Sequence, residues 1–320
     1  MAVMEAHHRF GSRVSSAGRD HSFAAEMAEA RRRLAAVHSE TFESPAGTVE
    51  FLDEGGGLPV LVSHGVLGGH DNIRELVDLW CGSQYRAVGP SRFGYLGSEM
   101  PPSATVAMQA DVYAALLDHL GLERVVVCGF SAGGPAAIQF TLRHPDRLHG
   151  LVLGSSYLPG MGARAAPKAL LPLVRAVIGW ERGWWLLKRY RPRLLARIMG
   201  VPKTWDPSGD DDFLSIRQAL FPIRPKRFGI AFDAVVSEPA SNHFPLEDVT
   251  VPTLFVHAAD DRLAPYEHVE PAVNRVPNAH LVTIQSGGHL FLEHAEAVRQ
   301  ATSTFINDVT ATPRPTELGV

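Results

Sequence analysis

Four short, mainly apolar runs of strand length alternate along this chain with segments of helical spacing. The runs cover residues 59–63, 125–128, 148–153 and 253–256. A strand that is apolar at nearly every position must be buried on both faces, as strands in the middle of a parallel sheet are. The alternation therefore predicts βαβ units and an α/β fold, with a mostly parallel sheet flanked by helices.

Other segments extend the same alternation. Residues 48–52 alternate like a half-exposed strand, and further strands are expected at 85–88 and 279–284. Helical patterns occupy residues 73–80, 106–120, 132–142 and 295–309. The alternation stops near Tyr157 and resumes in the second half of the chain, so the sheet domain is predicted to contain an insertion.

The interruption, roughly residues 157–246, is predicted to be a helical cap inserted into the sheet domain. An apolar stripe at near-helical spacing runs through it, and Pro192 predicts a break between two helices. The stripe consists of Trp180, Trp184, Leu187, Leu194 and Ile198. Packing against the core is the favoured interpretation of the stripe, and it is compatible with a second role as the roof of a pocket.

The expected organisation is thus a sheet-domain core in two parts with additions at both ends. The parts are an N-terminal extension (1–38), the first core segment (39–156), the cap (157–246), the second core segment (247–310) and a tail (311–320). Residues 23–37 favour an amphipathic helix that packs on the protein's own surface, although a partner or a membrane surface is an alternative.

Composition excludes several classes of function. The chain has 320 residues, 45% of them hydrophobic, and a net charge of −4, which gives no electrostatic reason to expect nucleic acid as a partner. No apolar run is long enough for a secretory signal or a membrane span. The two cysteines, Cys81 and Cys128, form no metal-ligand spacing, and a cytoplasmic location is expected. No phosphate-binding or dinucleotide motif occurs, so neither a cofactor nor a metal is expected.

The sequence Gly-Phe-Ser-Ala-Gly at residues 129–133 lies between a buried strand and a helix. In that context Ser131 must occupy a tight, strained turn, flanked by glycines because side chains would collide with the neighbouring strand and helix. The turn exposes the Ser131 hydroxyl and aims the helix N-terminus at the same point. Ser131 is therefore the predicted nucleophile.

A serine nucleophile needs a base and an orienting carboxylate. Among the 15 histidines, His289 follows Ser-Gly-Gly after the last strand, at the sheet edge where catalytic loops gather. Asp261 lies just after the strand at 253–258 and is the predicted carboxylate, with Asp260 as the alternative. The order Ser, Asp, His along the chain is typical of α/β folds that carry such a triad.

A glycine-containing loop at residues 63–69 follows the second strand and is predicted to form the oxyanion hole. The backbone N–H groups of Val66 and Ala132 are expected to converge on the substrate oxygen. His64 is expected to support this loop by hydrogen bonding. Phe130, Trp184 and Leu290 are predicted to line the substrate pocket.

These motifs resemble those of the α/β-hydrolase superfamily in its capped branch. The matching segments are His64-Gly65, residues 91–98, residues 129–133, residues 261–265 and Gly288-His289. The resemblance implies an eight-stranded, mostly parallel sheet, and it implies that Asp261, four residues before Pro265, is the catalytic acid. Ser91 departs from the aspartate that many relatives carry. Serine at position 131, in the turn between strand and helix, disfavours epoxide hydrolases and haloalkane dehalogenases, which use aspartate there.

We therefore expect hydrolysis of a small-molecule carboxylic ester, lactone or thioester by a monomer or homodimer. Carbon–carbon bond hydrolysis, acyl transfer and cofactor-free perhydrolysis are alternatives on the same triad, and a ligand-binding receptor with negligible turnover is an alternative of another class. A basic cluster is expected to be a solvated helix face, with an anionic substrate or a membrane surface as the alternatives. The cluster comprises Lys188, Arg189, Arg191, Arg193 and Arg197.

Overall fold

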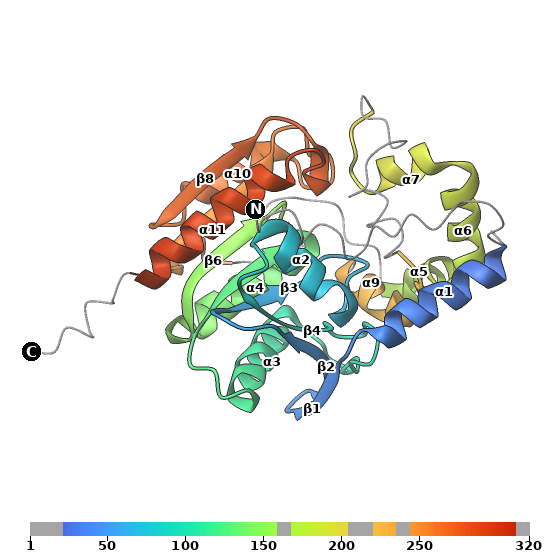
Figure 1. The fold of residues 1–320 in the computed structure, drawn as a ribbon, viewed down its shortest axis with the longest axis horizontal. Helices are drawn as coiled ribbons and strands as arrows, with labels where there is room; N and C mark the ends of the chain where they lie inside the picture. Colours follow the sequence, from blue (N-terminus) through green and yellow to red (C-terminus); the bar gives the residue numbers. More distant parts are fainter. Residues whose placement is uncertain (1–21, 159–167, 204–219, 235–243, 312–320) are drawn as a thin grey trace, which may run out of the picture.

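The computed structural model describes residues 22–158, 168–203, 220–234 and 244–311, so the predictions for residues 1–21 and 312–320 lie outside the described residues. Eight strands form one sheet in the order β1-β2-β4-β3-β5-β6-β7-β8 (Figure 1). Only the β1–β2 and β2–β4 pairs in this sheet are antiparallel, which confirms the predicted mostly parallel eight-stranded architecture. The strands are β1 Glu40–Ser44, β2 Gly47–Glu54, β3 Pro59–Ser63, β4 Arg86–Pro90, β5 Val125–Phe130, β6 Leu148–Gly154, β7 Thr253–Ala258 and β8 Ala279–Ile284.

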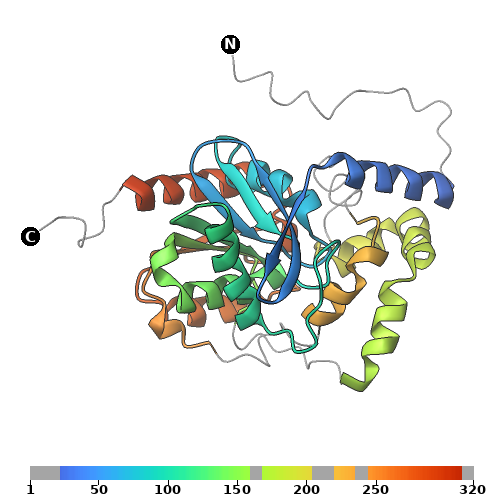
Figure 2. The same cartoon turned by 90° about the horizontal axis from the view of Figure 1, so that it is seen from below.

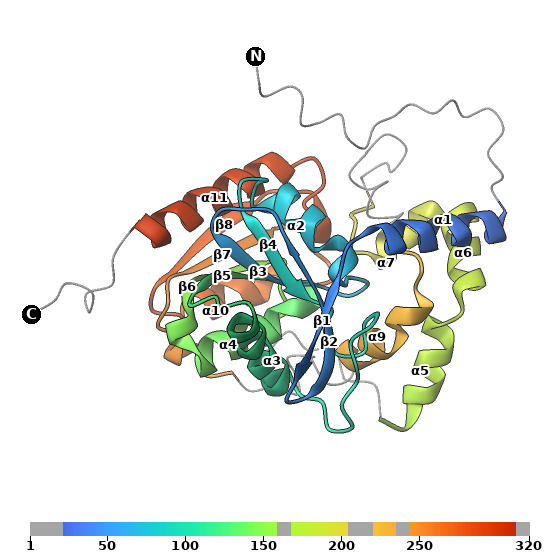
Figure 3. The ribbon, with the colours of Figure 1, turned by 60° about the horizontal axis from the view of Figure 1, so that its bottom comes forward.

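Helices cover both faces of the sheet (Figures 1 and 3). Helices α3, α4 and α10 pack on one face, and α2 and α11 pack on the other. Side chains of β5 alternate between the two cores: Val125 and Val127 join the first, and Val126 and Cys128 join the second. These helices are α2 Ile73–Trp80, α3 Val106–His119, α4 Gly134–Arg143, α10 Val269–Val273 and α11 Ala295–Ala311.

Between β6 and β7, four α-helices of the described residues lie beside the sheet domain and are called the inserted helices below. They are α5 Leu171–Ile178, α6 Glu181–Tyr190, α7 Pro192–Ile198 and α9 Arg227–Asp233. Pro192 is the first residue of α7, where its missing N–H leaves no hydrogen bond unmade, so the predicted break falls between α6 and α7. None of the described helices is long and apolar enough to cross a membrane.

The predicted apolar stripe divides into a packed part and an exposed part. Trp184 and Leu187 pack into a cluster with the buried Leu195. Trp180, Leu194 and Ile198 instead face solvent. The interpretation of the stripe as packing therefore applies to only part of it.

The N-terminal helix α1 (Phe23–Ala36) packs on the protein's own surface, as expected, and its position is next to α6 (Figures 2 and 3). Ser22 caps it by accepting a hydrogen bond from Ala25 N. The Trp185 indole N–H donates to Glu26 at 2.8 Å, and the Phe23 ring meets the Trp185 ring edge-on. Met27 is buried in the same contact.

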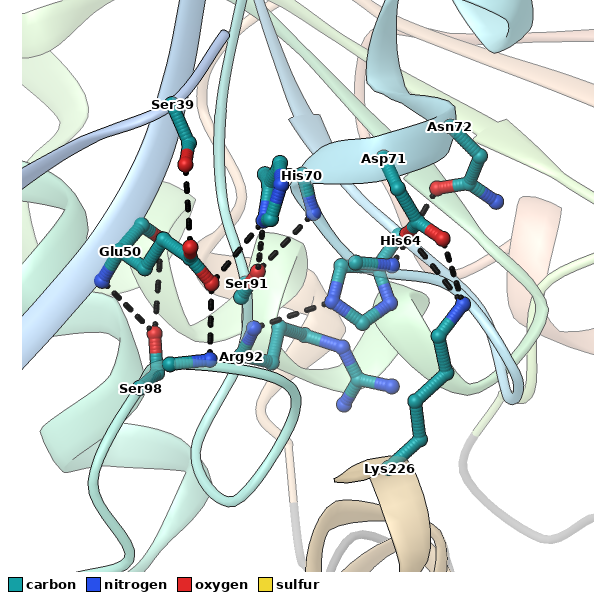
Figure 4. Close-up of polar contacts among 12 residues, drawn as sticks. Ser39, Glu50, His64, His70, Asp71, Asn72, Ser91, Arg92, Ser98 and Lys226 are labelled. Carbon is teal, nitrogen blue, oxygen red and sulfur yellow. Dashed lines mark hydrogen bonds and ion pairs between the residues drawn. The ribbon is translucent and has the colours of Figure 1, made fainter. Parts of the chain in front are cut away.

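Two buried ion pairs join the segment containing α9 to the sheet domain. The Lys226 ammonium is fully buried and donates to the Asp71 carboxylate at 2.9 Å and to the Leu67 carbonyl at 2.8 Å (Figure 4). The Arg92 guanidinium binds the Asp233 carboxylate through two hydrogen bonds of 2.7 and 2.5 Å. Bidentate pairing of this kind satisfies both charges where water is excluded.

We expect Lys226→Met to destabilise the fold, because it leaves the largely buried Asp71 carboxylate without its cation. Removing one partner of a buried pair costs about 3–5 kcal/mol of unfolding free energy, which urea titration followed by circular dichroism would measure. Arg275→Gln, which breaks an exposed ion pair with Glu247, is the matched control and should leave the urea midpoint nearly unchanged. Equal midpoints for Lys226→Met and the unsubstituted chain would contradict a stabilising role for this pair.

Candidate active site

Ser131 stands at the sharp turn between β5 and α4. Its φ of 52° lies in the left-handed region, which confirms the strained backbone that the motif predicts. The flanking glycines are required by close approach: a Cβ on Gly133 would lie 2.0 Å from the Ser63 carbonyl oxygen, and one on Gly129 would lie 2.7 Å from Ala137 Cβ. The turn is thus packed directly between the end of β3 and the first residues of α4.

His289 lies in the loop that follows β8 and reaches the Ser131 hydroxyl. Its Nε2 is 2.8 Å from Ser131 Oγ. Gly287 and Gly288, with φ of 106° and 61°, turn the chain so that the imidazole points back across the sheet edge. The imidazole itself is buried. The ends of β5 and β8 therefore bring together two residues that are far apart in the chain.

Asp261 completes the arrangement from the end of β7. Its Oδ2 lies 2.8 Å from His289 Nδ1, and its Oδ1 accepts hydrogen bonds from Leu263 N and Ala264 N at 2.8 and 3.0 Å. Burial tends to raise the pKa of Asp261, but the charge of His289 and the hydrogen bonds to the carboxylate outweigh it. The pKa is held well below its usual range, so the group stays ionised.

The neighbouring carboxylate, Asp260, has a different contact. Its Oδ1 accepts a hydrogen bond of 2.8 Å from Gly288 N, the backbone immediately before the imidazole. Of the two aspartates considered from the sequence, Asp261 therefore contacts the imidazole, while Asp260 holds the loop that carries it. These contacts favour Asp261 as the orienting carboxylate.

The predicted oxyanion loop lies directly against Ser131. A Cβ on Gly65 would be 3.0 Å from Ser131 Cβ and 3.5 Å from Ser131 Oγ, so this residue has to be small. Val66 is partly exposed and Ala132 is fully buried. Leu67 adopts φ of 71°, and the Lys226 ammonium binds its carbonyl, so a cation from the insertion fixes this strained turn.

His64 supports the same loop, as predicted. Its Nδ1 donates to Gly65 O at 2.8 Å, and its Nε2 accepts from Arg92 N at 3.0 Å (Figure 4). Because one partner is a carbonyl and the other an N–H, these contacts require the neutral tautomer with hydrogen on Nδ1. Burial, together with the nearby charge of Arg92, holds the pKa of His64 well below its ordinary value.

Ser91, the departure from the pattern of many relatives, accepts a hydrogen bond of 2.9 Å from His70 N. The carboxylate beside it comes from another strand: Glu50 Oε2 lies 3.0 Å from His70 Nδ1 (Figure 4). Burial tends to raise the pKa of Glu50, but the contacts with His70 and Gly97 N lower it further than burial raises it. The carboxylate next to Ser91 and His70 is therefore supplied by Glu50 of β2 and not by residue 91.

The three residues predicted to line a pocket have different surroundings. The Phe130 ring is buried against Trp80, with centroids 4.5 Å apart, and this placement favours packing over substrate contact. Trp184 packs in the cluster that also contains Leu67 of the oxyanion loop. Leu290 packs with Val201 of the insertion, next to His289.

A model of the alpha/beta hydrolase fold matches residues 59–295, which is most of the chain and includes Ser131, Asp261 and His289. The chain belongs to the α/β-hydrolase family.

Relatives of this α/β hydrolase carry several activities in their names. It is 28% identical to the uncharacterized hydrolase YcgS of Bacillus subtilis over 273 residues, covering 81% of this chain and 94% of the relative. It is 26% identical to the 2-hydroxymuconate semialdehyde hydrolase of Pseudomonas putida, covering 81% and 90%. A solved thermophilic esterase from Thermogutta terrifontis is 27% identical, with a TM-score of 0.65 and coverage of 85% and 99%. Each of these three proteins is named as a hydrolase or an esterase.

The sequence predicted no supporting role for His257, which lies beside the α/β-hydrolase site. His257 is buried in β7, its Nε2 donates to Ala264 O at 2.7 Å, and the same nitrogen lies 3.4 Å from Asp261 Oδ2. It thereby supports the turn that presents Asp261. The available signal was a histidine in a mainly apolar strand, four positions before the aspartate.

We expect Asp261→Asn and Asp260→Asn to have unequal effects on this hydrolase. Loss of the carboxylate at residue 261 allows the wrong imidazole tautomer and should lower kcat about 10⁴-fold. Asp260→Asn keeps an oxygen that can accept from Gly288 N, so its loss in kcat should be much smaller. Steady-state kinetics on a chromogenic ester measures both, and a larger loss for Asp260→Asn would reverse the assignment.

Proposed function

We propose that this α/β hydrolase is a serine hydrolase that cleaves a small-molecule carboxylic ester, lactone or thioester. The observation that supports this most directly is the unbroken chain of contacts from Ser131 Oγ through the His289 imidazole to the Asp261 carboxylate, with both distances at 2.8 Å. The likeness to the Thermogutta terrifontis esterase over nearly all of that protein adds to it.

In the proposed reaction, Ser131 Oγ attacks the carbonyl carbon of the ester while His289 Nε2 takes the hydroxyl proton. The Asp261 carboxylate holds the proton on Nδ1 and stabilises the imidazolium that forms. The oxyanion would receive hydrogen bonds from the N–H groups of Val66 and Ala132, each of which typically contributes 10²–10³ in rate.

The tetrahedral species then collapses, and the imidazolium returns its proton to the departing alcohol. An acyl group remains on Ser131. Water, deprotonated by His289, attacks this acyl enzyme and releases the carboxylic acid, which restores the free hydroxyl. The rest of the molecule supplies the positions of these groups, and no cofactor is needed for the cycle.

The inserted helices fit the role of a cap over this site. The Gly200 carbonyl accepts a hydrogen bond of 3.3 Å from His289 N, and Leu290 packs against residues of the same segment. A segment that contacts the base residue on one side can select substrates by size and shape. Substrate selection is accordingly proposed to lie in residues 157–246.

Carbon–carbon bond hydrolysis is the second candidate, because the relative from Pseudomonas putida is named as a semialdehyde hydrolase and matches across most of both chains. The same nucleophile and base serve both reactions, so the leaving group decides between them. Product analysis would separate the two reactions. Ester hydrolysis yields an alcohol and a carboxylic acid, whereas hydrolysis of a carbon–carbon bond in a vinylogous diketone yields a ketone and a carboxylic acid.

We expect Ser131→Ala to lower kcat on esters by about 10⁶-fold, because the nucleophile is lost while the fold is kept. A fluorophosphonate probe should label the unsubstituted chain at Ser131 and leave the variant unlabelled, as intact-mass spectrometry would show. Ser156→Ala is the matched control, since Ser156 is a buried neighbour that hydrogen-bonds the Gly129 carbonyl and does not contact His289. Unchanged esterase activity in Ser131→Ala would exclude the mechanism. If the unsubstituted chain is neither labelled nor active but binds a ligand, the alternative of a ligand-binding receptor would be favoured.

A further inference from the structure

Exposed apolar side chains of the described residues gather on the inserted helices. Of ten large apolar side chains that face solvent, eight lie between residues 170 and 198. Leu173, Trp180 and Tyr190 have more than half of their surface exposed, at 61, 62 and 62%. Single exposed apolar residues are ordinary on a protein surface, but a concentration in one short segment is not.

The exposed residues follow helical spacing and therefore share faces. Leu173 and Val177 are four residues apart on α5, and Leu194 and Ile198 are four apart on α7. On α6 the same spacing links Leu186 to Tyr190, which line a hollow together with Trp180 and Gly183. These side chains and the arginines named below are called the α5–α7 surface.

The α5–α7 surface is also strongly basic. Residues 168–198 contain eight lysines and arginines against one acidic residue, in a chain whose net charge is −4. Five arginines of α6 and α7 and the turn between them are exposed: Arg182, Arg189, Arg191, Arg193 and Arg197. The surface stands at the end of the molecule opposite the C-terminal helix α11 (Figures 1 and 3). Positive charge is thus concentrated where the apolar side chains are.

Arginine interleaved with tryptophan, tyrosine and leucine on exposed helices is the composition of a segment that lies in the interface of a bilayer. Aromatic and aliphatic side chains enter the boundary between headgroups and acyl chains, and guanidinium groups bind lipid phosphates. A second copy of the chain fits less well, because a two-fold contact through this surface would bring its arginines against one another. Nucleic acid would leave the aliphatic side chains unused.

We propose that the α5–α7 surface binds the surface of an anionic lipid bilayer, without crossing it. The inference does not depend on the proposed hydrolysis, since the surface is built from residues other than Ser131, His289 and Asp261. It assigns a function to the basic cluster and to the part of the apolar stripe that does not pack against the protein.

Vesicle sedimentation of the full chain tests this. The protein should sediment with vesicles of phosphatidylcholine and phosphatidylglycerol, remain in solution with phosphatidylcholine alone, and be released as NaCl is raised from about 0.05 to 0.5 M. Arg189→Gln/Arg191→Gln should weaken binding about 30-fold, because each arginine near an anionic surface contributes about 1 kcal/mol. Trp180→Ser/Tyr190→Ser should weaken it at least tenfold by removing apolar anchors.

The double variant Arg143→Gln/Arg275→Gln is the matched control, because it removes two exposed arginines away from the α5–α7 surface and should bind like the unsubstituted chain. Circular dichroism and the thermal midpoint confirm that each variant is folded. No binding to anionic vesicles, or equal losses in the control and the Arg189/Arg191 variant, would overturn the proposal. The proposal would also be overturned if the chain self-associates but does not bind vesicles, and if Trp180→Ser/Tyr190→Ser abolishes the self-association. The α5–α7 surface would then be a contact between copies of the chain.

Discussion

The close approach of the start of α4 to the end of β3 is the contact on which the site depends. Gly133 sits so near the Ser63 carbonyl that a side chain could not be accommodated, and Gly65 lies against the Ser131 side chain, where a Cβ would be 3.0 Å from Ser131 Cβ. Because β3 and β5 are paired in parallel, with Ser63 opposite Gly129, both turns leave the sheet at the same level. The oxyanion loop and the nucleophile turn are therefore held together by strand register, and the positive φ of Ser131 is maintained by packing on both sides.

A second set of contacts converges on this region from behind the oxyanion loop. His64 bridges Gly65 O to Arg92 N, Lys226 binds Leu67 O, and Asp233 binds the Arg92 guanidinium. The loop that would present an oxyanion donor thus has its own carbonyls occupied by fixed donors. Preorganisation of this kind matters because donors that are already oriented require no rearrangement when charge develops on the substrate. The supporting groups are buried, so water does not compete for them.

Much of the core and the central site could be predicted from the sequence, because their signals are local. A serine between a buried strand and a helix, flanked by glycines, identifies Ser131, and a histidine after the last strand identifies His289. What could not be predicted depends on tertiary contacts. The strand β1 was missed because Phe42 is its single buried residue and the others are polar or exposed. Lys226 was missed because lysine is normally exposed. Only the folded chain shows that its ammonium group binds the Asp71 carboxylate and the Leu67 carbonyl.

The buried ion pairs also show that the helices of the insertion do not all have the same attachment to the sheet domain. Sequence patterning treats residues 157–246 as one cap. In the structure, however, α9 and α6 are attached to the rest of the protein by different ion pairs. Displacing α9 would separate Arg92 from Asp233 and Lys226 from Asp71, leaving charges buried and unpaired at several kcal/mol each. Within the described residues, the ion pair that α6 makes, between Lys188 and Glu26, leads to α1 and not to the sheet domain. Buried charged contacts therefore tie α9 to the core and the oxyanion loop. Helix α6 is tied to α1 by its ion pair, and it reaches the core through apolar packing, with Trp184 and Leu187 in the same cluster as Leu67.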